Sequence, residues 1–118
     1  MPLQIFNTTQ QTVIALHAEK ADTFSSRMKG LLNRDLLPSD EALIITQCQS
    51  IHMFFMKFPI DVIFVDRKDR VVGWVKNIKP NYLSPIYWNA SYAIELNVGV
   101  IEKSNTAIGD ILEIKENP

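Results

Sequence analysis

The chain has 118 residues, of which 47% are hydrophobic and 21% are charged, as is usual for one soluble globular domain. Twelve Lys and Arg against 13 Asp and Glu give a formal net charge of -1, so nucleic acid and anionic membranes are poor default partners. The single cysteine excludes an intrachain disulfide, and no signal peptide or membrane-length apolar segment is visible, which predicts one cytoplasmic domain over residues 1–118.

The first third of the chain predicts a β-hairpin followed by a helix. The β-prone runs "LQIFN" and "TVIALHA" flank the polar "TTQQ", which indicates two paired strands. The period then changes, because four apolar residues follow the i, i+4, i+7, i+8 spacing of one helical face. These residues are Phe24, Met28, Leu31 and Leu32. We therefore expect one main helix near residues 22–34, with Asp22 or Thr23 as its N-cap.

The middle of the chain predicts further strands. "ALIITQ" and "IHMFFMKF" are apolar β segments, and Pro59 should end the second of them. "IDVIFVD" and "RVVGWVKN" flank the charged "RKD", which is the clearest hairpin signal in the sequence. The next segment, "IKPNYLSPIYWNAS", contains two prolines and several polar turn formers, so it is predicted to be an irregular loop.

"YAIELNVG" and "DILEIK" are predicted as closing strands, and the residues between them, "VIEKSNTAIG", could hold one helical turn. The elements together predict a single compact α+β domain, mostly antiparallel β, with the helix near residues 22–34 covering the sheet. A curled or barrel-like sheet would limit the number of exposed edges in so small a chain.

Cys48, His52 and Met56 are spaced four residues apart and have the side-chain types of soft copper sites. In an extended strand, residues four apart are separated by about 13 Å, which is too far for ligands of one ion. We therefore expect no metal site, with Cys48 and Met56 packed as hydrophobic residues. The chain contains no P-loop, no dinucleotide fingerprint and no other familiar cofactor motif, so no cofactor is predicted.

His52 lies in an apolar run, where a titratable side chain needs a partner. It is either a buried imidazole that fixes the fold or an acid-base group oriented by Asp61 or Glu95. Both carboxylates interrupt apolar strands and need partners if they are buried. Arg27 on the predicted helix is a candidate counterion for either of them, and an exposed, solvated Arg27 is the alternative.

Five aromatic residues between positions 74 and 92 could form the rim of a binding site. These are Trp74, Tyr82, Tyr87, Trp88 and Tyr92. Aromatic residues on a proline-containing loop can equally seal one end of a barrel. Lys57, Lys76 and Lys79 add positive charge nearby, but too few basic residues are present to indicate nucleic-acid binding.

Several segments together resemble one known family. "RMKGLL", "CQSIHMFFMKFPIDVIFVDRKDRVV", "KP" at residues 79–80 and "AIELNVGVIEKSNTAIGDIL" are similar, in this order, to the prokaryotic family called domain of unknown function 192. The resemblance covers residues 10–115. It implies a small, mostly β domain that occurs alone or behind secretion signals and has no established reaction. The matching positions are Arg27, Gly30, Leu31, His52, Phe55, Met56, Lys57, Asp61, Pro80, Glu95, Gly99 and Gly109.

These observations favour a non-enzymatic domain that binds a small ligand or a protein partner through a polar cluster. The predicted binding residues are Arg27, His52, Met56, Lys57, Asp61 and Glu95. The alternative is a hydrolase-like acid-base enzyme, with His52 as the base and Asp61 or Glu95 orienting it. A third hypothesis is that the polar cluster only stabilises the fold.

Overall fold

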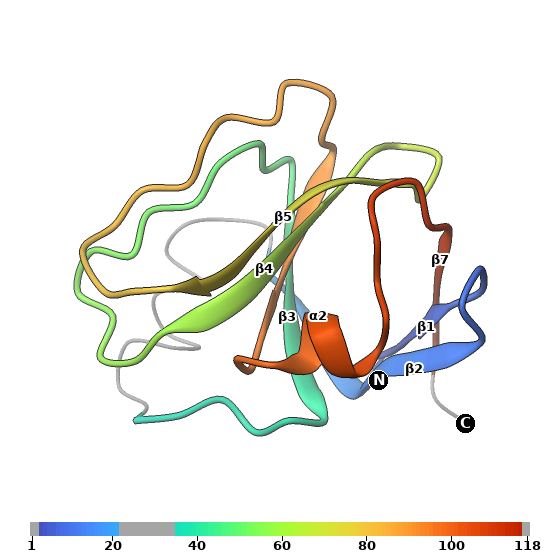
Figure 1. The fold of residues 1–118 in the computed structure, drawn as a ribbon, viewed down its shortest axis with the longest axis horizontal. Coiled ribbons are helices and arrows are strands. Elements are labelled where there is room, and N and C mark those ends of the chain that lie inside the picture. Colours follow the sequence, from blue (N-terminus) through green and yellow to red (C-terminus); the bar gives the residue numbers. More distant parts are fainter. Residues whose placement is uncertain (1–2, 22–34, 117–118) are drawn as a thin grey trace.

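The structure is a computed structural model that describes residues 3–21 and 35–116 (Figure 1). Its strands are β1 (Leu3–Asn7), β2 (Thr12–Ala21), β3 (Glu41–Thr46), β4 (Ile60–Val65), β5 (Val71–Ile78), β6 (Tyr92–Leu96) and β7 (Leu112–Glu116). One short helix in these ranges, α2 (Val100–Lys103), follows β6. The helix predicted near residues 22–34 lies outside the described residues.

The strands form one seven-stranded sheet in the order β5-β4-β6-β3-β2-β1-β7. Neighbouring strands are antiparallel, except that β2 and β3 are parallel. The sheet curls until its two edge strands approach at one end, where the Val71 amide donates to the Asp110 carbonyl at 2.8 Å and the Gly109 amide donates to the Val71 carbonyl at 2.8 Å. The result is the curled, mostly β domain that the sequence predicts.

Each face of the sheet has its own hydrophobic core. On the concave face, Ile63 and Ile94 from the middle of the sheet meet Val71 and Leu112 from its two edges. On the convex face, Ile45, Val62, Phe64 and Ala93 pack under residues of the loops 47–59 and 79–91. Because β4 contributes to both cores, all six of its residues are buried.

One strand prediction is wrong. Residues 51–58 do not form a strand, and of this segment only His52 makes an isolated bridge, to Leu83. The chain turns here because the Met56 amide donates back to the Met53 carbonyl at 3.3 Å and Phe55 adopts a left-handed backbone conformation. The predicted strands at both ends of the chain, the β4–β5 hairpin, the irregular loop after it and the helical turn are all confirmed.

A buried polar network locks the end of the sheet where the edges meet. The Asn7 side-chain amide donates to Asp110 at 3.0 Å and to Thr106 at 3.1 Å. Asp110 also accepts from the Ala107 backbone amide at 2.9 Å and from the Gln10 side chain at 3.1 Å. Burial by itself raises the pKa of the Asp110 carboxyl, but the bonds donated by Asn7, Ala107 and Gln10 outweigh it and leave the pKa below its usual value.

Asp110→Asn is expected to reduce the free energy of unfolding by about 1–3 kcal/mol at pH 7, because a buried acceptor is replaced by a donor. The pKa of Asp110 is lower in the folded than in the unfolded state, so its stabilising contribution is fully present above about pH 4 and is lost as the pH falls towards the folded-state value. The difference between the two proteins should therefore narrow below pH 4 in denaturant melts. A difference that stays constant down to pH 2 would contradict this assignment.

Candidate functional site

The two long loops on the convex side, residues 47–59 and 79–91, are joined into one unit that we call the loop ribbon. In Figure 1 they run side by side away from the strands. The Met53 amide donates to the Tyr82 carbonyl at 2.9 Å, and the Ser84 amide donates to the Ile51 carbonyl at 2.9 Å. The Tyr87 amide donates to the Gln49 carbonyl at 2.8 Å. These bonds extend along the ribbon, so its surface is held in one arrangement.

The loop ribbon anchors one set of apolar side chains in the convex core and exposes another. Ile51, Met53 and Phe58 are buried against the sheet. The exposed set contains Phe54, Phe55, Tyr82, Leu83, Ile86 and Trp88, and the exposed fraction reaches 73% for both Phe55 and Trp88. Large aromatic side chains exposed together on an ordered surface are characteristic of interaction sites rather than of random exposure.

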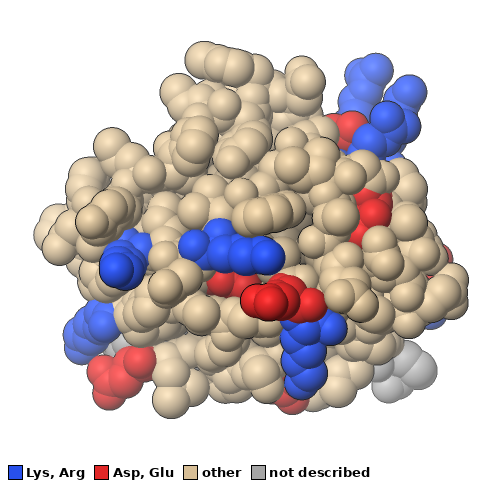
Figure 2. All heavy atoms as spheres, viewed as in Figure 1, with Lys and Arg blue, Asp and Glu red and all other residues tan. Residues whose placement is uncertain are grey.

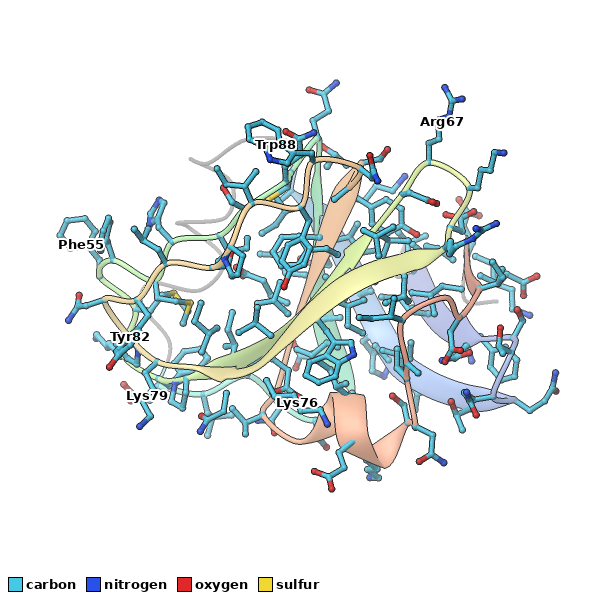
Figure 3. The ribbon with its side chains drawn as sticks, turned by 45° about the horizontal axis from the view of Figure 1, so that its top comes forward. Phe55, Arg67, Lys76, Lys79, Tyr82 and Trp88 are labelled. Carbon is cyan, nitrogen blue, oxygen red and sulfur yellow. The ribbon has the colours of Figure 1, made fainter. Side chains whose placement is uncertain are left out.

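Figure 3 shows Phe55, Tyr82 and Trp88 projecting outward from the loop ribbon rather than towards the strands. Phe55 and Tyr82 lie near the outer end of the ribbon, and Trp88 lies nearer to the sheet. Arg67, on the β4–β5 turn, lies further to the right than all three in this view. The three labelled aromatic side chains therefore follow the loop ribbon from its outer end to its end near the sheet.

The loop ribbon carries positive charge only. Its two segments contain Lys57 and Lys79 and no Asp or Glu. Most of the upper left of Figure 2, where Figure 1 places these loops, is free of charged side chains. An apolar surface with two lysines therefore stands apart from the mixed charges of the rest of the domain.

Three of the predicted binding residues belong to the loop ribbon. His52 is partly buried, and its ring stacks on Phe54 with 5.1 Å between the ring centroids. Met56 packs in the convex core, and Lys57 is exposed. His52 therefore lies beneath the exposed surface and supports one of its aromatic side chains.

The Asp61 carboxylate is held by backbone amides of β5 and of the start of α2. Asp61 is 1% exposed, and its carboxylate accepts three backbone hydrogen bonds. The donors are the amides of Asn77 at 2.9 Å, Gly99 at 3.1 Å and Ile101 at 3.2 Å. Two of these amides belong to the first turn of α2, so Asp61 fixes the helix against β4 and provides the carboxylate that a helix N-terminus favours.

The structure does not bring Asp61 and Glu95 together. In the antiparallel register of β4 and β6, Asp61 is opposite Leu96 and Val62 is opposite Glu95. Because successive side chains alternate between faces, Asp61 points to the concave face and Glu95 to the convex face. Glu95 is 0% exposed. Arg27 lies outside the described residues, so its pairing with Glu95 stays a prediction.

The sequence predicts only part of the exposed surface. Tyr82 and Trp88 belong to the aromatic residues expected to form a rim or a seal, and Phe55 is among the positions that carry the family resemblance. Phe54, Leu83 and Ile86 were missed because their sequence context does not show whether they face the core or the solvent. The sequence feature that marks this surface is the absence of Asp and Glu from residues 47–59 and 79–91.

Residues 3–21 and 35–116 contain no group of three or more His, Cys, Asp or Glu that could hold a metal ion. No helix in this part of the chain has the length and apolar character needed to cross a bilayer.

Comparison with known proteins gives one consistent family. The family model described as "Uncharacterized ACR, COG1430", domain of unknown function 192, matches residues 5–114. A UPF0127 protein of Thermococcus sibiricus is 37% identical over 117 residues, which cover 92% of this chain and 73% of that protein. A second UPF0127 protein, from Thermococcus gammatolerans, is 37% identical over 116 residues, which cover 92% of this chain and 72% of that protein.

Among solved structures, a protein of unknown function from Novosphingobium aromaticivorans has a similar fold. Its TM-score is 0.79 at 25% sequence identity, and the match covers 96% of this chain and 84% of that one. The similarity extends over nearly the whole chain, so it includes both the curled sheet and the loop ribbon. The chain therefore belongs to the uncharacterised prokaryotic family called domain of unknown function 192.

Proposed function

We propose that this domain is a non-enzymatic binding module whose loop ribbon docks a protein partner in the cytoplasm. The observation that carries the proposal is the set of exposed aromatic residues on two loops that hydrogen bonds hold together. Aromatic side chains supply much of the binding free energy at protein interfaces. A surface that is already ordered loses less conformational entropy when a partner binds.

The charge of the loop ribbon indicates the chemistry of the partner. Lys57 and Lys79 flank the aromatic residues, and the ribbon has no acidic side chain. We propose a protein segment with apolar anchors and neighbouring Asp or Glu, because opposite charges at the rim favour encounter and orient the partner. Two lysines are too few for a nucleic-acid surface, and this chain has a net charge of -1.

The geometry disfavours the form of the hydrolase-like alternative in which Asp61 orients His52. Both oxygens of Asp61 are hydrogen-bonded to backbone amides, so this carboxylate is not available to orient the imidazole. The imidazole of His52 stacks on Phe54. His52 and Met56 are therefore proposed to support the binding surface from below, and Lys57 to lie at its rim.

The proposal predicts crosslinking from one side of the domain. A photoreactive phenylalanine analogue at Phe55 should give a discrete adduct with one other protein when the labelled chain is produced in its own cells. The same analogue at Ile108 is the matched control, because Ile108 is 65% exposed on the loop between α2 and β7, away from the ribbon. Mass spectrometry of the adduct should identify a crosslinked segment rich in Asp or Glu.

Combined Phe55→Ser and Trp88→Ser should abolish binding of that partner, while changing the free energy of unfolding by about 0.5 kcal/mol or less because both side chains are exposed. Combined Lys57→Glu and Lys79→Glu should weaken binding roughly tenfold.

Equal adducts from positions 55 and 108 would overturn the proposal. So would an adduct only to a second copy of the chain or only to phospholipid, since these identify a homo-oligomer or a membrane surface.

A further inference from the structure

A second site lies on the concave face, at the end of β2, β3 and β6 away from α2. In the sheet register, Lys20 of β2 is opposite Ile44 of β3, and Thr46 of β3 is opposite Tyr92 of β6. Directly opposed residues share a face, and Ile44 belongs to the concave core. The face that is apolar along most of its length therefore ends in Lys20, Thr46 and Tyr92.

These polar residues surround a cavity of about 360 Å³. Ile44 and Ile114 provide its apolar surface, Lys20 and Tyr92 line it from the strands, and Asp69 and Ser91 complete it from adjoining loops. The volume lies within the range of small-molecule sites, and the open end of a curled sheet is a common place for them. Apolar walls with a few converging polar groups are the usual composition of such a site.

Asp69 is held in position by Tyr92. The Tyr92 hydroxyl donates to Asp69 Oδ1 at 2.8 Å. Burial, followed by the hydrogen bond and the negative charge of Asp69, raises the pKa of Tyr92 well above its usual value. Tyr92 therefore remains protonated and donates to the carboxylate throughout the physiological pH range. Asp69 Oδ2 accepts no hydrogen bond from residues 3–21 and 35–116 and can receive one from a ligand.

Lys20 provides the opposite charge on the other side of Ile44. The strands β2 and β6 flank β3. At the usual strand separation, this places their backbones about 10 Å apart. Lys20 is exposed and forms no ion pair with any residue of the described ranges. A cation and a carboxylate thus lie on the two sides of one apolar floor.

We propose that this cavity binds a small zwitterion with an apolar side chain, such as a free α-amino acid. The ligand's ammonium group would donate to Asp69, its carboxylate would accept from Lys20, and its side chain would pack on Ile44 and Ile114. Each charged group of the ligand meets a group of opposite charge, and hydrogen bonds between charged groups are stronger than neutral ones. This site is separate from the loop ribbon and does not depend on the function proposed for it.

L-Leucine titrated into the ¹⁵N-labelled protein tests the proposal. Saturable shifts are expected for the amide signals of Lys20, Ser91 and Tyr92 at concentrations up to about 10 mM, which covers millimolar dissociation constants. 4-Methylpentanoate lacks the ammonium group of leucine, and 3-methylbutylamine lacks its carboxylate. Each of these analogues should bind about tenfold more weakly, because each loses one charged contact.

Two substitutions distinguish the contacts. Lys20→Gln should weaken leucine binding about tenfold and leave 3-methylbutylamine unaffected, whereas Asp69→Asn should weaken leucine equally and leave 4-methylpentanoate unaffected. Lys103→Gln and Glu102→Gln are the charge-matched controls on exposed residues elsewhere. No saturable shift with leucine, shifts centred outside the cavity, or equal losses in the control variants would each overturn the proposal.

Discussion

Asp61→Ala is expected to lower the free energy of unfolding by about 3–5 kcal/mol, which is a large effect for the substitution of one buried polar residue. The substitution leaves the amides of Asn77, Gly99 and Ile101 without their acceptor. The Ile101 amide is buried, so water cannot replace the lost bond without disturbing α2. Thermal unfolding should show a fall in Tm of roughly 12–20 °C.

Two other variants separate this role from a general effect of charge. Asp61→Asn keeps one acceptor oxygen but places a donor against the remaining amides, so its loss of stability should be smaller than that of Asp61→Ala. Glu102→Ala, on the exposed side of α2, should change the free energy of unfolding by about 0.5 kcal/mol or less. If Asp61→Ala changed it by no more than this control, Asp61 would not be the structural anchor of α2.

Asp61 and Glu95 lie on opposite faces of the sheet, and the sequence alone does not predict this placement. Both residues interrupt apolar strands, and in the structure all of β4 and all of β6 except Tyr92 are buried. All six residues of β4 are buried, so no alternation of polar and apolar residues shows which side of the strand faces which core. The assignment of Asp61 and Glu95 to opposite faces requires the register between β4 and β6, which the sequence pattern does not contain.

The backbone conformation of the loop ribbon is also not predicted by the sequence. The run of apolar residues from Ile51 to Phe58 predicts a strand, and the alternation of side chains along a strand would place His52, Phe54, Met56 and Phe58 on one face. In the structure Met56 and Phe58 are buried, whereas Phe54 is exposed and His52 is partly buried. The backbone turns between Met53 and Met56 and pairs with a distant proline-containing loop, so the period of two is lost. Local sequence patterns predict the regular strands well, because the same pattern of apolar and β-prone residues continues along each strand.

Gly73 connects the sheet to the loop ribbon. It lies on β5 directly opposite Phe64 of β4. The Tyr87 ring, from the ribbon, stacks on Phe64 with 4.4 Å between ring centroids. A Cβ atom at Gly73 would lie 2.1 Å from a ring carbon of Tyr87, a distance that carbon atoms do not adopt. The absence of a side chain at this position is therefore what allows Tyr87 to seat residues 79–91 on the sheet.

Gly73→Ala is accordingly expected to destabilise the domain by about 2–3 kcal/mol, the cost of overpacking a well-filled contact. Because Tyr87 must move, and its amide donates to Gln49, the displacement should extend to the other loop of the ribbon. Amide chemical shifts of residues 47–59 should change together with those of residues 79–91. Binding at the loop ribbon should weaken more than the loss of stability explains.

A double-mutant cycle distinguishes this contact from the general cost of adding a methyl group to a strand. Tyr87→Leu removes the ring that the new methyl group would strike, so Gly73→Ala should cost much less in the Tyr87→Leu background than in the natural sequence. The expected coupling energy is about 1–2 kcal/mol, measured from denaturant unfolding of the four proteins. Additive effects would mean that Tyr87 is not what restricts position 73. The ribbon's arrangement would then depend on its inter-loop hydrogen bonds rather than on this aromatic contact with the sheet.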